Sequence, residues 1–140
     1  MFSLYGKTIV LGVTGSVAAY KAADIASRLT QAGAKVQVVM TEAAQKFVTP
    51  MTFRAVTRQP VVTSIWDMAS EFSVAHVSLA AAADVILIAP ATANTIAKLA
   101  HGLADDILTS TVLASRAPVI VAPAMNDKMY ANPATRENMA

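Results

Sequence analysis

The segment Gly12-Val13-Thr14-Gly15-Ser16 joins an apolar run to a helical pattern and is rich in glycine and hydroxyl side chains. At such a strand-to-helix junction Ser16 can cap the helix, while free backbone N–H groups of the first helical turn face an anion. The chemistry that this segment offers is phosphate binding. The same glycines can also serve only to make a tight turn, so the segment alone decides nothing.

A second junction offers similar chemistry. Thr92 and Asn94 follow an apolar run and open another helical pattern, so they can hold a phosphate or the edge of a ring. Two helix N-termini at one crevice suit a mononucleotide. A dinucleotide such as NAD is disfavoured, because the G-x-G-x-x-G pattern is not met. Moreover, Thr41 stands where NAD sites usually place a carboxylate for the ribose, although Glu42 is adjacent.

The elements that must position these residues alternate between strand and helix. Short β-branched runs predict buried strands at residues 7–14, 35–41, 84–89 and 118–122. Helical patterns lie at residues 16–33, 42–47, 50–57, 77–83, 92–101, 105–115 and 133–140. Residues 125–130 are predicted to form a polar loop, and the stretch that holds Trp66 and residues 71–73 is predicted to be irregular.

This alternation predicts an α/β protein with a doubly wound parallel sheet, in a Rossmann-like or flavodoxin-like arrangement of three layers. Ligands in such folds sit beyond the carboxyl ends of the strands. The most polar loops follow these ends, at residues 14–16, 41–42, 90–94 and 123–126. We therefore expect these loops to converge on one rim of the sheet.

Composition narrows the remaining possibilities. Residues 1–140 have the length of one domain. Only 14% of the residues are charged, against roughly 25% in typical domains, and 55% are apolar. The apolar surplus predicts a subunit interface and hence a homo-oligomer.

Basic residues form no run, so a nucleic-acid partner is not expected. Asp84 and Pro90 interrupt the most apolar stretch and residues 8–13 are too short for a signal peptide, which predicts a cytoplasmic protein without a membrane span.

Three segments together resemble the flavin-dependent cysteine decarboxylases. They are TGSVAAYK at residues 14–21, APATANTIAK at residues 89–98 with Ala104-Asp105-Asp106 after it, and PAMNDKM at residues 123–129. The third matches the P-x-M-N-x-x-M signature of the family. The resemblance runs over nearly the whole chain in the family's order, and it is closest to the phosphopantothenoylcysteine decarboxylase branch. It implies that residues 1–140 form an FMN-binding flavoprotein domain.

Membership of that branch implies decarboxylation of 4'-phosphopantothenoylcysteine to 4'-phosphopantetheine in coenzyme A biosynthesis. FMN would oxidise the cysteine moiety to a thioaldehyde, after which carbon dioxide is lost easily. The resemblance also implies the residues that contact FMN, with no metal ion. These are Gly15, Ser16, Val17, Thr41, Pro90, Thr92, Asn94, Lys98 and Thr109.

The resemblance assigns His76 and Asn126 to catalysis. His76 matches the family's essential histidine, and an imidazole can exchange a proton near neutral pH; a histidine taken alone is more often a capped or core residue. Asn126 matches the signature asparagine, whose amide can hold the substrate carboxylate over the flavin, although Asn after a strand is a common turn residue. Met125 and Met129 are expected to pack on flavin or substrate, where methionine is otherwise a gap filler.

Family members continue into a flap that clamps the substrate and carries a cysteine for the final reduction. The sequence has no cysteine, so we expect the clamp to be absent, the last step to lack its acid, and the chain to be part of a longer protein. A fused phosphopantothenate–cysteine ligase domain and a homotrimer, alone or assembled into a dodecamer, are implied by the same resemblance. The alternatives are an FMN-binding module without turnover and a relative of the flavin prenyltransferases.

Overall fold

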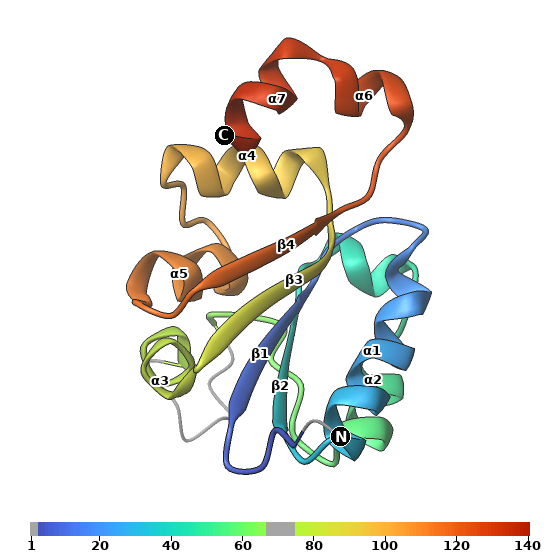
Figure 1. The fold of residues 1–140 in the computed structure, drawn as a ribbon, viewed down its shortest axis with the longest axis vertical. Coiled ribbons are helices and arrows are strands. Elements are labelled where there is room, and N and C mark those ends of the chain that lie inside the picture. The colour runs from blue at the N-terminus through green and yellow to red at the C-terminus, as the bar shows by residue number, and fades with distance from the viewer. Residues whose placement is uncertain (1–2, 67–74) are drawn as a thin grey trace.

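The strands form one parallel sheet in the order β2-β1-β3-β4 (Figure 1). The computed structural model describes residues 3–66 and 75–140, without the side chains of residues 75 and 76. The strands are β1 (Thr8–Val13), β2 (Lys35–Met40), β3 (Val85–Ala91) and β4 (Val119–Pro123). The predicted α/β class and parallel sheet are therefore confirmed, while residues 71–73, expected to be irregular, lie outside the description.

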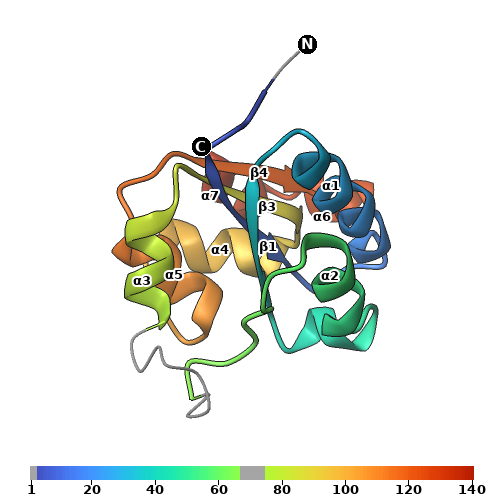
Figure 2. The ribbon, with the colours of Figure 1, turned by 90° about the horizontal axis from the view of Figure 1, so that it is seen from below.

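Helices cover both faces of this sheet, which gives the predicted three layers (Figure 2). The helices of the described chain are α1 (Ala19–Gln31), η1 (a 3₁₀ helix, Ala43–Lys46), α2 (Pro50–Thr57), α3 (Ala75–Ala82), α4 (Ala93–His101), α5 (Ile107–Ala114), α6 (Asp127–Ala131) and α7 (Pro133–Met139). The first three lie on one side of the sheet, and α3, α4 and α5 lie on the other. Helix α7 packs against α4.

The side chains of β1 alternate between two apolar cores. Ile9 and Leu11 pack with the buried alanines of α1 and with Phe53 of α2. Val10 packs on the opposite face with Ile86 of β3 and residues of α4 and α5. Successive side chains of a strand point to opposite faces, so an unbroken apolar run is what a central strand needs when helices cover both of its faces.

Gly12 interrupts the apolar run of β1 because α5 approaches the strand closely there. A Cβ atom added at Gly12 would lie 2.6 Å from Cδ1 of Leu108, a side chain that is fully buried. This glycine therefore belongs to the packing of helix against sheet, and its part in the glycine-rich segment is structural.

The variant Gly12→Ala is expected to lower the free energy of unfolding by about 1–3 kcal/mol, because the new methyl group overpacks the core beneath α5. Urea unfolding of the flavin-free protein measures this loss. Adding Leu108→Val shortens the side chain in question, so the double variant should be more stable than the two single losses predict when added. Strict additivity would show that Leu108 is not the obstacle.

Helix α6 replaces the polar loop that was predicted for residues 125–130. Asn126 caps this helix, since its Oδ1 accepts a hydrogen bond of 2.9 Å from the N–H of Met129. Asparagine is favoured both in turns and at helix N-caps, and the sequence does not tell the two apart.

Helix α1 begins at Ala19 instead of Ser16, because Ser16 forms a turn in which its Oγ accepts from the N–H of Ala18 at 3.1 Å.

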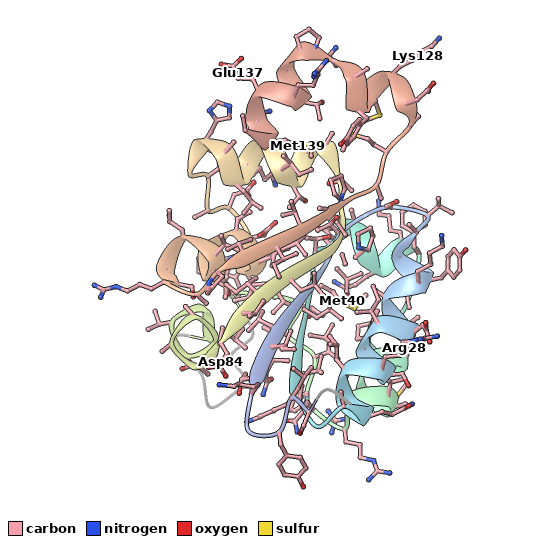
Figure 3. The ribbon with its side chains drawn as sticks, in the orientation of Figure 1. Arg28, Met40, Asp84, Lys128, Glu137 and Met139 are labelled. Carbon is pink, nitrogen blue, oxygen red and sulfur yellow. The ribbon has the colours of Figure 1, made fainter. Side chains whose placement is uncertain are left out.

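Strand β3 runs through Pro90 to Ala91, two residues beyond its predicted end, and the Ala89–Pro90 peptide bond is cis. Asp84 precedes this strand at the opposite end of the sheet from Met40 (Figure 3). Its Oδ2 accepts a hydrogen bond of 2.8 Å from the N–H of Thr8, which ties the beginnings of β1 and β3 together.

None of the helices in the described residues has both the length and the apolar character needed to cross a membrane.

Candidate flavin-binding site

A cavity of about 580 Å³ lies at the carboxyl ends of β1, β2 and β3. Its volume is in the range of ligand and cofactor sites. The residues that line it are Gly15, Thr41, Glu42, Ala43, Lys46, Thr92, Asn94, Thr95, Lys98, Asp105 and Asp106. Three loops that are far apart in the sequence therefore converge at one rim, as the polarity of the strand ends predicted. The fourth predicted loop, residues 123–126, contributes none of the lining residues.

Gly15 allows the loop after β1 to pack directly on the loop after β2. An added Cβ at Gly15 would lie 2.5 Å from Cβ and 3.2 Å from the carbonyl carbon of Ala43. The backbone of Gly15 has no positive φ, so close approach and not turn geometry requires the glycine. Its backbone N–H has no acceptor among the described residues and is available to a ligand.

The loop after β3 presents the start of α4. Thr92 caps this helix, accepting a hydrogen bond of 3.1 Å from the N–H of Thr95. The Thr92 hydroxyl donates in turn to Oγ1 of Thr95, also at 3.1 Å. The backbone N–H of Asn94 has no acceptor within the described part of the chain. Because a helix N-terminus carries partial positive charge, this group can bind an anionic oxygen.

One lysine of the cavity is paired with two of its carboxylates. Lys98 Nζ lies 3.0 Å from Oδ1 of Asp105 and 3.9 Å from Oδ2 of Asp106. With Glu42 and Lys46 included, the lining holds three carboxylates and two ammonium groups. The side chains thus carry an excess of negative charge. A bound phosphate would be met chiefly by backbone N–H groups, which is the arrangement found at helix N-termini. Lys46, which forms no ion pair among the described residues, lies in the same lining.

The structure brings five of the predicted FMN-contacting residues to the cavity: Gly15, Thr41, Thr92, Asn94 and Lys98. Ser16, Val17, Pro90 and Thr109 are not among the lining residues. Val17 is 74% exposed at the start of the turn into α1. Thr109 is buried, and its hydroxyl donates to Oδ1 of Asp106 at 2.8 Å. It therefore stabilises the position of Asp106, which lines the cavity.

Three of the residues predicted to act on the substrate, Asn126, Met125 and Met129, are not among the lining residues of the cavity. Asn126 uses its side-chain oxygen to cap α6, and its NH₂ group has no acceptor among the described residues. Met125 is partly buried against the core of α4 and α5, and Met129 is 45% exposed on α6. His76 lies in the first turn of α3, and its side chain is outside the description. The roles of these residues stay predictions.

Several residues that line the cavity were not predicted from the sequence. Ala43 and Lys46 lie on η1, which begins directly after Glu42 of the predicted rim. Asp105 and Asp106 stand at the start of a helix predicted from the sequence, where carboxylates are expected to cap N–H groups. The structure confirms this expectation, since Asp106 caps α5 in a capping box with Thr109. The pattern D-D-x-x-T before an apolar run was the signal for this cap, but nothing in the sequence indicated that Lys98 would reach these carboxylates.

The fold and the cavity define an α/β flavoprotein. The family model described as Flavoprotein matches residues 3–140, and the chain belongs to this family. The coenzyme A biosynthesis bifunctional protein CoaBC of Vibrio vulnificus is 55% identical over 140 residues, which are 100% of this chain and 35% of the relative. A probable phosphopantothenoylcysteine decarboxylase of Streptococcus mutans is 48% identical over 136 residues, covering 96% of this chain and 76% of the relative.

The solved structures agree with these relatives. The crystal structure of the FMN-dependent cysteine decarboxylase SpaF superposes with a TM-score of 0.89 at 40% identity, over 98% of this chain and 79% of that one. The chain thus spans about a third of the length of the Vibrio relative and about three quarters of the length of the Streptococcus relative.

Proposed function

We propose that this chain is the FMN-binding part of an enzyme that decarboxylates 4'-phosphopantothenoylcysteine to 4'-phosphopantetheine in coenzyme A biosynthesis. The observation that carries the proposal is the cavity at the carboxyl ends of the strands, where Gly15, Thr41 and Asn94 meet. Its support comes from the family and from relatives whose names describe a coenzyme A biosynthesis protein and a phosphopantothenoylcysteine decarboxylase.

The cavity fits a flavin mononucleotide in size and in the kind of donors that it offers. The backbone N–H groups of Gly15 and Asn94 would hold the phosphate. The hydroxyl oxygens of Thr41 and Thr92, whose own protons are donated to Val13 and Thr95, would face the ribityl chain. Lys98, kept in place by Asp105, would contact the remaining polar part of the cofactor. When bound, FMN supplies an isoalloxazine ring that accepts electrons from the substrate.

The protein's own residues would orient the substrate and move its protons. His76 would take a proton from the thiol end of the substrate, a task for which an imidazole is suited near neutral pH. The NH₂ group of Asn126 would donate to the substrate carboxylate and orient it for loss of carbon dioxide, while its Oδ1 remains bonded to the N–H of Met129. Met125 and Met129 would supply apolar contacts beside it.

Two measurements on the purified protein test this proposal. The protein is expected to be yellow or, once stripped, to take up one FMN with recovery of flavin absorbance. Incubation with phosphopantothenoylcysteine is then expected to release carbon dioxide. Flavin binding without carbon dioxide release would favour a binding module, and transfer of a prenyl group from a prenyl phosphate would favour a prenyltransferase. A protein that folds but takes up no FMN would exclude all three.

We also propose that the chain works as a homo-oligomer, a trimer or trimers assembled into a dodecamer, and that a ligase domain is fused to it. Large apolar side chains are exposed on α1 and β4, among them Tyr20 and Ile120, which supports an interface there. The match to one third of a bifunctional relative supports the fusion. Sedimentation that showed only monomers would contradict the oligomer. A cytoplasmic location stays a prediction from the sequence.

A further inference from the structure

Thr14 links the two loops of the cavity by a buried pair of hydrogen bonds. Its side chain is 1% exposed. Oγ1 donates a hydrogen bond of 2.6 Å to the carbonyl oxygen of Pro90 and accepts one of 3.0 Å from the backbone N–H of Thr92. A single hydroxyl therefore joins the end of β1 to the residues on either side of Ala91.

This link stands where the backbone pairing of the sheet stops. The pairing of β1 with β3 ends at Gly12 and Ile88. Between Ile88 and Ala91 the register of β3 against β4 shifts, and Pro90 has no N–H to contribute. The carbonyl group of Pro90 and the N–H of Thr92 thus leave the regular ladder close to the core, where unsatisfied backbone groups are costly. The hydroxyl of Thr14 satisfies both groups.

Thr14 itself is not among the residues that line the cavity, but its neighbours in the hydrogen-bond network are. Gly15 follows it directly, and Thr92 begins the helix whose first turn carries the free N–H of Asn94. Among the described residues, the hydroxyl of Thr14 thus makes the hydrogen bonds that span the separation of these two loops. Covalent neighbours alone do not fix it, because the two loops are joined through the sheet only as far as Gly12 and Ile88.

We infer that Thr14 is a positioning residue whose hydroxyl holds the loop after β1 and the start of α4 at the spacing that FMN binding requires. The choice of FMN as the ligand rests on the proposed function; the link between the loops does not. A hydroxyl that donates and accepts at once is needed, so serine can replace threonine here, whereas valine, which has nearly the same shape, cannot.

The test compares Thr14→Val and Thr14→Ser with the matched control Thr111→Val. Thr111 is equally buried, and its hydroxyl donates to the carbonyl oxygen of Ile107 at 2.7 Å within α5, away from the cavity lining. Titration of the flavin-free proteins with FMN is expected to show a dissociation constant raised about tenfold or more for Thr14→Val. Thr14→Ser and Thr111→Val should stay within about twofold of the unaltered protein.

Amide hydrogen exchange at Thr92, followed by NMR without FMN, provides a second readout. In Thr14→Val this N–H loses its acceptor and should exchange about tenfold faster or more, whereas in Thr111→Val it should not. Equal FMN affinities and equal Thr92 exchange in the two valine variants would overturn the inference. If the unaltered protein binds no FMN, the proposed function fails, and the exchange rate still decides whether Thr14 holds the loops together.

If Thr14→Val is too unstable to study, Thr14→Ala replaces it and is compared with Thr14→Ser. These two variants lack the same methyl group and differ only in the hydroxyl. Weaker FMN binding and faster Thr92 exchange in the alanine variant than in the serine variant would support the positioning role. Equal behaviour of the two would overturn it.

Discussion

The variant Gly15→Ala is expected to weaken FMN binding by about 100-fold or more, the effect of displacing binding groups by about an ångström. The new Cβ would lie 2.5 Å from Cβ of Ala43. The carbonyl carbon of Ala43, at 3.2 Å, leaves little room for the new methyl group to shift. The loops after β1 and β2 must therefore separate, and with them the N–H of Gly15 moves away from its ligand. Quenching of FMN fluorescence on titration with the flavin-free protein measures the loss.

Two further variants show whether this contact is the cause. Ala43→Gly combined with Gly15→Ala removes the Cβ partner of the clash and should restore much of the affinity. Gly6→Ala serves as the control, because Gly6 has a φ of 78° but nothing near its missing Cβ. It should lower stability by about 1–2 kcal/mol through backbone strain and leave FMN binding unchanged. If Gly15→Ala binds FMN as tightly as Gly6→Ala does, close packing of the two loops is not what the site requires.

The parallel sheet was predictable because apolar residues on both faces of a strand leave few other arrangements. In β1, Ile9 and Leu11 pack in one core and Val10 packs in the other. A strand with one solvated face would instead have alternated between apolar and polar residues. The short helix α6 was not predictable in the same way. Its start depends on whether Asn126 bonds to the N–H of Met129 or closes a turn, and both use the same residue types.

The glycine-rich segment shows why the site was only partly predictable. Gly12 and Gly15 are equivalent in the sequence, yet one lies beneath Leu108 and the other against Ala43. Their roles are set by residues of α5 and η1, which local patterns do not pair with them. The same holds for Lys98. Its partners Asp105 and Asp106 lie between α4 and α5, and they come within reach of Lys98 only when these two helices have packed. Patterns locate strand ends; tertiary packing decides which side chains meet there.

The paired charges of the cavity bear on which ligands it can hold. The side chains that line the cavity include three carboxylates and two ammonium groups, so each phosphate added to the ligand increases an existing excess of negative charge. The backbone N–H groups of Gly15 and Asn94 come from two loops of the cavity lining, and neither has an acceptor among the described residues. A ligand with one phosphate satisfies this arrangement, which supports a mononucleotide on grounds independent of the missing dinucleotide fingerprint.

The variant His76→Asn is expected to lower the rate of carbon dioxide release by about 10²- to 10⁴-fold, the usual contribution of a group that transfers a proton in the rate-limiting step. Asparagine keeps a polar side chain able to form hydrogen bonds but cannot take up a proton near neutral pH. FMN uptake should be unchanged, since the proposed cofactor contacts come from other residues. Single-turnover release of labelled carbon dioxide from phosphopantothenoylcysteine measures the rate.

The chain's other histidine provides the matched control. His101 is exposed at the end of α4, where its Nε2 lies 3.1 Å from Oδ1 of Asn138 on α7. His101→Asn should therefore leave both FMN uptake and carbon dioxide release close to those of the unaltered protein. Because proton transfer is separate from cofactor binding, the role proposed for His76 requires that its variant lose turnover while remaining yellow. Equal turnover in the two histidine variants would remove His76 from the chemistry and leave it a structural residue of α3.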